Sequence, residues 1–314
     1  MVDAPRTATR HRIVFREVVA MTISPLYTIH KYREDTFKVV CFKRNLDSDG
    51  LALRVRDPDE FQHNETKLDN NLSRARSMVL QYALCNLWEW FFTGILDKRK
   101  YDRFNLDKYM IDLPQWVRDM RKKYKAKFQV LLVPERHGDG AWHIHGLVRG
   151  LPPSALIPFH CTAKQGERIP QKLVDGGFFN WPDYQDKFGF CSMGVVRNPI
   201  ATAYYITKYI SKDLAGRGGD LGKHLYFHSR PLKTAHRVSD VYAYNRQLED
   251  YCVNDYDFCK TGMVHDAKWW FPLVWDGVDI PEYIPPAAVD PLADFDPGTV
   301  EPPREVWEQL GLWA

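Results

Sequence analysis

The chain has 314 residues, of which 45% are hydrophobic and 26% charged, and its formal net charge at pH 7 is +3. This composition excludes wholesale disorder and leaves room for one catalytic domain with extensions. The sequence offers no apolar run of membrane-spanning length, no signal-peptide core and no C-x-x-C pair among its six cysteines, so we expect a reduced, cytoplasmic protein with no membrane partner.

Residues 1–70 are predicted to form an N-terminal extension, in which the β-branched and aromatic run from Thr36 to Lys43 is typical of a strand. A helix is predicted from Asn70 to Asn86, where apolar residues alternate with good helix formers. Four short segments follow that are rich in aromatic or β-branched residues and bounded by turn residues, and they predict the core strands. These segments are Trp88–Leu96, Lys127–Pro134, Ala141–Val148 and Phe188–Gly194.

Between the first two of these segments, apolar residues from Leu113 to Tyr124 fall on one side of a predicted helix, and the other side is basic. From Lys98 to Lys127 the chain carries eleven Lys and Arg residues against four Asp. Such a face suits a nucleic-acid backbone, although a solvated helix surface gives the same pattern. The candidate contacts on this face are Arg118, Arg121, Lys122 and Lys123.

A pair of histidines marks the third strand segment. Side chains alternate along a strand, so His143 and His145 should share one face while Ile144 points to the core. Glu135 ends the preceding strand across a tight loop, and an antiparallel hairpin would bring its carboxylate to the histidines. Nitrogen and oxygen ligands together suit a catalytic Mg²⁺ or Mn²⁺. His137 and Asp139 are alternative third ligands, and the competing interpretation is a pair of surface histidines.

A well-marked helix is predicted from Pro199 to Leu214, because Asn198 can cap its start and Gly216 suits the position after its end. One side of this helix carries alternating tyrosines and lysines, which we consider candidate catalytic groups: Tyr205, Lys208, Tyr209 and Lys212. A tyrosine oxygen can act as a nucleophile, and a lysine can lower the phenol pKa or hold a phosphate. The alternative is amphipathic packing with lysines extended to water.

The last part of the chain has a different composition. Residues 261–314 are predicted to be a proline-rich, acidic extension after a catalytic domain that covers residues 71–260. From Asp276 to the end the chain has nine Asp and Glu residues and Arg304 as its single basic residue. We therefore expect an extended or partly disordered segment beyond about Asp279.

Three motifs, in this order, resemble the HUH superfamily of single-strand endonucleases, and specifically the phage-type rolling-circle replication initiators. FFTGILD from Phe91 to Asp97 is similar to the family's first strand, except that Gly94 and Ile95 replace the usual residues. PERHGDGAWHIHG resembles the metal-binding histidine motif, and YITKYISK resembles the double-tyrosine helix. The resemblance covers about Trp88 to Leu214.

The resemblance implies an α+β fold with a five-stranded antiparallel sheet, related to the RRM or ferredoxin-like arrangement, flanked by helices and with the histidine strand central. It also implies nicking and joining of single-stranded DNA at a replication origin. One tyrosine would form a 5′-phosphotyrosyl link, and the second would cut the completed copy. A host DNA polymerase would extend the free 3′-OH.

A helicase activity is not expected from this chain. The glycine-rich run from Gly216 to Leu225 lacks the P-loop spacing, and His224 stands where Ser or Thr should bind Mg²⁺. Unwinding would then depend on a host helicase. An HUH transposase or plasmid relaxase would use the same site, whereas a non-enzymatic RRM-like nucleic-acid-binding protein would need no metal ligands.

Overall fold

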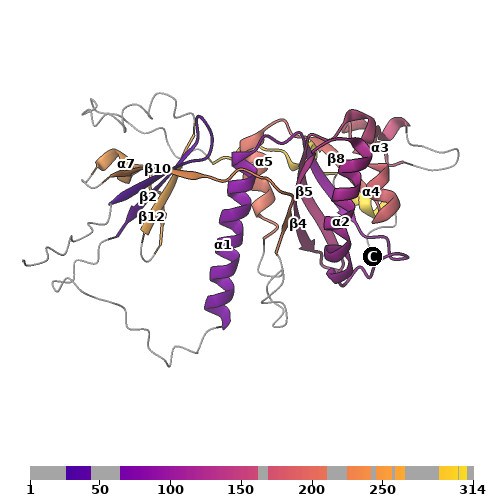
Figure 1. Cartoon of the computed structure of the whole chain (residues 1–314), viewed down its shortest axis with the longest axis horizontal. Helices are drawn as coiled ribbons and strands as arrows, with labels where there is room; N and C mark the ends of the chain where they lie inside the picture. The colour runs from indigo at the N-terminus through magenta and orange to yellow at the C-terminus, as the bar shows by residue number, and fades with distance from the viewer. Residues whose placement is uncertain are drawn as a thin grey trace, which may run out of the picture.

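The computed structural model describes residues 26–43, 64–161, 169–210, 225–241, 245–256, 259–265, 290–302 and 304–309. Figure 1 shows two sheets at opposite ends of the molecule, with helix α1 (Asn64–Cys85) between them. All strand pairs are antiparallel. The predicted α+β class, with a central antiparallel sheet flanked by helices, is therefore confirmed.

The larger sheet has seven strands in the order β6-β7-β8-β3-β5-β4-β9. Its strands are β3 (Trp90–Ile95), β4 (Gln129–Arg136), β5 (Trp142–Arg149), β6 (Ile157–Pro158), β7 (Phe179–Asn180), β8 (Cys191–Val195) and β9 (Phe227–His228). The four longer strands are the four that the sequence predicts. Seven strands replace the expected five because three two-residue strands, too short to show a pattern in the sequence, extend the sheet at both edges.

Helices cover both faces of this sheet. Their bounds are α2 (Asp107–Tyr124), α3 (Gln171–Asp175), α4 (Pro182–Lys187) and α5 (Pro199–Thr207), with the short helices η1 (Pro153–Ala155) and η2 (Phe159–Cys161). On one face, α1 and α5 pack over Leu131, Val133 and Leu147. On the other, α2 and α4 pack over Leu132 and Ile144. The alternation of side chains along β4 and β5 thus feeds two separate cores.

The smaller sheet, which the sequence predicts only through its strand at Thr36–Lys43, joins two distant parts of the chain. Its order is β10-β1-β2-β12-β11, and its core includes Phe37, Val39 and Leu248. The strands are β1 (Tyr27–Lys31), β2 (Phe37–Phe42), β10 (His236–Val241), β11 (Asn254–Asp255) and β12 (Cys259–Val264), and α7 (Arg246–Asp250) packs nearby. The predicted boundary between an extension and a catalytic domain at residue 70 stays a prediction.

The acidic segment near the end of the chain packs on the larger sheet. It contains η3 (Pro297–Thr299) and α9 (Arg304–Gln309). Val300 joins the core beneath α1 and α5, and Val306 joins a small cluster around Leu173. The expectation of an extended or disordered segment is therefore wrong for residues 290–302 and 304–309, because their few apolar side chains find partners that are distant in sequence.

Several sequence predictions fall outside the described residues. These are Lys212, the end of the tyrosine helix at Leu214 and nearly all of the glycine-rich run that ends at Leu225. Within the described parts of the chain, none of the helices combines the length and apolar character needed to cross a bilayer.

Candidate active site

The histidine strand β5 lies between β3 and β4, and this pairing sets the geometry of the site. His145 is opposite Thr93 on β3 and Val133 on β4, and His143 is opposite Glu135. Both imidazoles are almost completely buried, while Ile144 joins the core on the other face of the sheet. The predicted division of the strand into a histidine face and a core face is thus confirmed.

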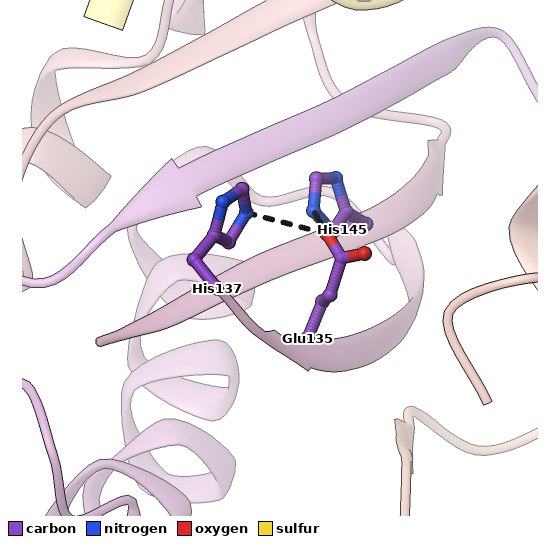
Figure 2. A group of neighbouring side chains, drawn as sticks. All are labelled: Glu135, His137 and His145. Atoms are coloured by element: carbon purple, nitrogen blue, oxygen red, sulfur yellow. Dashed lines mark hydrogen bonds and ion pairs between the residues drawn. The ribbon is translucent and has the colours of Figure 1, made fainter. Parts of the chain in front are cut away.

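The β4–β5 hairpin gathers three groups that are able to hold a metal ion, shown in Figure 2: Glu135, His137 and His145, whose ligand atoms all lie within 4.8 Å of one another. The Glu135 Oε2 atom is 2.9 Å from His145 Nε2 and 3.3 Å from His137 Nε2. His137, one of the alternative ligands, begins the tight loop that connects the two strands. One carboxylate and two imidazoles form a donor set that fits a divalent metal.

His143 lies beside this group. Its ring centroid is 3.5 Å from that of His137, and Trp307 of α9 lies 6.4 Å away. Burial, reinforced by the neighbouring His137 and His145, lowers the pKa of His143 far below the ordinary histidine value. His143 is therefore neutral at pH 7, the form in which an imidazole binds a metal.

Glu135 is held in its charged form. Burial by itself would raise the pKa of the Glu135 carboxyl, but hydrogen bonds and charge interactions with His137 and His145 outweigh it and lower this pKa well below the usual range. The carboxylate is consequently ionised across the physiological pH range. A negative ligand between imidazoles is suited to attract a cation.

The tyrosine helix is shorter than the sequence predicts. Asn198 caps α5 as expected, its side chain accepting a hydrogen bond from the Ala201 amide at 3.0 Å, but α5 ends at Thr207. Beyond that residue the amides of Lys208 and Ile210 bond to carbonyls three residues back, which tightens the chain into turns. Tyr209 therefore lies just past the helix rather than on it.

This tightened turn places both tyrosines against the histidine strand. The Tyr209 ring stacks on His145 with a centroid distance of 3.8 Å and an interplanar angle of 4°. Tyr205 packs against Phe91 of β3 and lies perpendicular to Tyr209 at 5.6 Å. Both side chains are buried, so the predicted face of α5 turns toward the sheet and away from water.

Glu301 connects the two tyrosines. Its Oε2 atom accepts hydrogen bonds from the Tyr205 hydroxyl at 3.0 Å and from the Tyr209 hydroxyl at 2.5 Å. Burial, together with the negative charge of Glu301, raises the pKa of both phenols well above the ordinary tyrosine value. The sequence gives no local signal for this residue, because it lies 92 positions beyond Tyr209 in a segment that reads as an acidic extension.

The remaining residues of the tyrosine motif divide between the site and its surroundings. The Lys208 ammonium lies 3.6 Å from the Tyr205 ring centroid and 4.8 Å from that of Tyr209, and burial lowers its pKa. Tyr204 points elsewhere, with its hydroxyl 3.3 Å from His265 Nε2. Lys208 thus joins the tyrosines, as predicted from spacing, whereas Tyr204 does not.

The four predicted DNA contacts on α2 are not brought to this site. They lie on the helix that packs against the opposite face of the sheet from the histidines. The Arg121 guanidinium donates to the Phe128 carbonyl at 2.7 and 2.9 Å, and Lys123 pairs with Asp183 at 2.6 Å. Arg118 and Lys122 are exposed. Contact between these side chains and DNA stays a prediction.

Two buried hydroxyls next to the histidines are not apparent from the sequence. Thr93 on β3 pairs with His145 on one side and with Ser192 of β8 on the other, which forms a polar row across three strands. Neither hydroxyl has a hydrogen-bond partner within the described parts of the chain. Unsatisfied polar groups of this kind in a core are typical of a functional surface.

Comparison with known proteins gives one match. A family model for replication-associated proteins of the ORF2 type matches residues 90–214. Neither the curated proteins nor the solved structures yield a significant match. The matched segment contains the hairpin, the histidine strand and both tyrosines, so the resemblance to a Rep-type replication initiator is confirmed over residues 90–214, where the chain matches the replication-associated protein family.

Proposed function

We propose that this protein starts and ends rolling-circle replication by nicking and rejoining single-stranded DNA through Tyr205 and Tyr209. The observation that carries the proposal is the stacking of Tyr209 on His145 at 3.8 Å, within a segment that matches a replication-associated family. A candidate nucleophile therefore lies against a candidate metal ligand. Tyr205 reaches the same place, since both hydroxyls bond to one carboxylate oxygen.

The proposed metal ligands are Glu135, His145 and a third imidazole, from His143 or His137. This donor set fits Mg²⁺ or Mn²⁺, because it joins a carboxylate with neutral imidazoles. A bound divalent ion would supply Lewis-acid stabilisation of the charge that develops on the scissile phosphate. The residues of the chain keep the site dry, since both histidines of β5 are almost fully buried.

In the proposed cleavage step, one tyrosine oxygen attacks phosphorus and the bond from phosphorus to the 3′ oxygen breaks. The phenol gives up its proton and the departing 3′ oxygen takes one up, so a 5′-phosphotyrosyl link and a free 3′-OH result. The ammonium of Lys208, which lies over both rings, is placed to offset negative charge near the reacting oxygen. Attack by the free 3′-OH on the phosphotyrosine reverses the step and rejoins the strand.

Two tyrosines suit a reaction that must cut twice. After the first tyrosine is linked to DNA, the second remains available to cut the completed copy, and the strands can then exchange. The partners of this function are single-stranded origin DNA, a host helicase and a host DNA polymerase in the cytoplasm. The DNA backbone would be followed in part by the basic face of α2, where Arg118 and Lys122 are exposed.

A covalent-adduct assay tests the proposal. Labelled single-stranded origin DNA is incubated with the protein and Mn²⁺, and the product is separated under denaturing conditions. We expect a protein–DNA adduct that EDTA abolishes. Tyr205→Phe and Tyr209→Phe should each lose one of the two cutting steps, and the double variant should form no adduct.

Tyr204→Phe is the matched control, because Tyr204 lies next to Tyr205 in the chain but contacts His265 instead of the site. Its adduct yield should equal that of the unaltered protein. Cleavage retained by the double variant would remove the tyrosines from the mechanism. A folded protein that forms no adduct with any candidate origin strand would refute the nicking function.

A further inference from the structure

Glu301 reaches the candidate site from outside the matched segment. The chain around it is anchored by Val300 in the core beneath α1 and α5, and by Val306 and Trp307, both buried. The Val300 backbone also passes directly over Gly194 of β8, where a Cβ atom would collide with it. The position of Glu301 is therefore fixed by packing on both sides.

The carboxylate of Glu301 has three neighbours that belong to the proposed chemistry. Its Oε2 atom accepts from both tyrosine hydroxyls, and its Oε1 atom is 3.7 Å from His145 Nδ1. The side chain is only 17% exposed. One acidic group thus lies between both candidate nucleophiles and a candidate metal ligand.

The two nitrogens of His145 face different carboxylates. Nε2 is 2.9 Å from Glu135 in the candidate metal group, and Nδ1 faces Glu301 from the other side. A histidine that binds a metal through one nitrogen commonly directs the other toward a carboxylate, which fixes the tautomer and the ring orientation. Glu301 occupies that position relative to His145.

We propose that Glu301 is a positioning residue that directs both tyrosine hydroxyls to one point and orients His145 toward the metal. This inference rests on the proposed function and adds to it a residue that the matched segment does not contain. A single carboxylate oxygen shared by two phenols gives both tyrosines the same target region. The same phosphate could then be reached first by one and later by the other.

The test compares three variants. Glu301→Ala removes the acceptor, Glu301→Gln keeps a carbonyl acceptor without the charge, and Glu305→Gln alters an exposed carboxylate on the same segment that pairs with Lys172 at 3.1 Å. Mn²⁺ affinity is measured by calorimetry without DNA, and adduct formation is measured in Tyr205→Phe and Tyr209→Phe backgrounds. Thermal melting of each variant verifies that it is folded.

We expect Glu301→Ala to weaken Mn²⁺ binding by about 10- to 100-fold, as is typical when the outer partner of a metal-binding histidine is lost. Adduct formation should fall in both single-tyrosine backgrounds, because each hydroxyl loses the same acceptor. Glu301→Gln should retain more adduct formation than Glu301→Ala, and Glu305→Gln should match the unaltered protein in both measurements.

Two results would overturn the inference. Unchanged Mn²⁺ affinity and adduct yield in folded Glu301→Ala would leave Glu301 without a role. Faster adduct formation in that variant would mean that the carboxylate obstructs the site. Absence of adduct in the unaltered protein refutes the nicking function instead, and the Mn²⁺ comparison then decides the Glu301–His145 part separately.

Discussion

The imidazole of His143 lies among other potential cations, beneath the chain that carries Trp307. Its neighbours His137 and His145 would repel a proton on it, and burial opposes the charged form as well. Glu135 has the opposite character, because contacts with His137 and His145 favour its ionised form. One group of residues thus contains a neutral imidazole and a charged carboxylate, which is what binding of a divalent metal requires.

These lowered pKa values predict how stability depends on pH in the metal-free protein. The pKa of His143 is lowered from about 6.5, so below that pH the unfolded chain binds more protons than the folded one and stability falls. The pKa of Glu135 is lowered too, so its contribution is present above about 4.3 and is lost as the pH falls further. Both effects have the same sign.

Urea unfolding in EDTA, followed from pH 7 to pH 4, measures this dependence. His143→Gln should reduce the loss of stability between pH 6.5 and pH 5, since the group that takes up the proton is gone. His160→Gln serves as the control because His160 is exposed. An unchanged pH slope in His143→Gln would contradict the burial of a neutral imidazole at this position.

At the scale of elements, the β4–β5 hairpin carries the candidate metal group. Its register places Glu135 opposite His143, and the loop closes with the Gly140 amide bonded to the His137 carbonyl at 2.8 Å. Gly140 has φ +85°, a left-handed conformation that favours glycine. The glycine that follows His145 has a different role, because β4 approaches Gly146 closely.

Gly146→Ala should disturb this approach. A Cβ atom at Gly146 would lie 2.7 Å from the Leu131 carbonyl oxygen and would also collide with the Leu132 side chain. We expect a loss of about 1–3 kcal/mol in the free energy of unfolding, typical of overpacking in a core. Weaker Mn²⁺ binding should accompany it, since β5 carries His145.

Gly138→Ala is the matched control in the same hairpin, because a Cβ atom there meets nothing within 4 Å. Denaturant unfolding and Mn²⁺ calorimetry of the two variants check the expectation. Equal stability of both variants would show that β5 can shift away from β4 without cost.

At the scale of the whole molecule, the described residues form separate cores around two sheets. Cores on both faces of the larger sheet hold the candidate site and its supporting helices, and the core of the smaller sheet includes Phe37, Val39 and Leu248. The smaller sheet depends on β1 and β2 from the N-terminal part and on β10 and β12 from beyond residue 235. Its strands therefore come from both sides of the matched segment.

Removal of residues 1–35 tests this separation, because it deletes β1, which pairs with both β2 and β10. We expect the buried thiols of the smaller sheet, such as Cys41 and Cys252, to become reactive toward a thiol reagent. Cys191 lies in the other core and should stay protected. Mass spectrometry of the labelled cysteines measures this, and equal exposure of Cys191 would mean that the two sheets fold as one unit.

The sequence by itself determined the four long strands, the histidine face of β5, the capped start of α5 and the match to a replication family. These features depend on local signals: alternation along a strand, turn residues and a capping side chain. The same signals placed Glu135 near the histidines, because a tight hairpin fixes which residues face each other.

Only the tertiary structure decided the remainder of the site. The helix carrying Tyr205 ends at Thr207, the smaller sheet combines distant strands, and Glu301 reaches both tyrosines across more than 90 residues. Contacts at such separation leave no periodic pattern, since they depend on how the cores pack rather than on neighbours in the chain. An acidic segment that looks unstructured in the sequence therefore supplies the carboxylate at the centre of the candidate site.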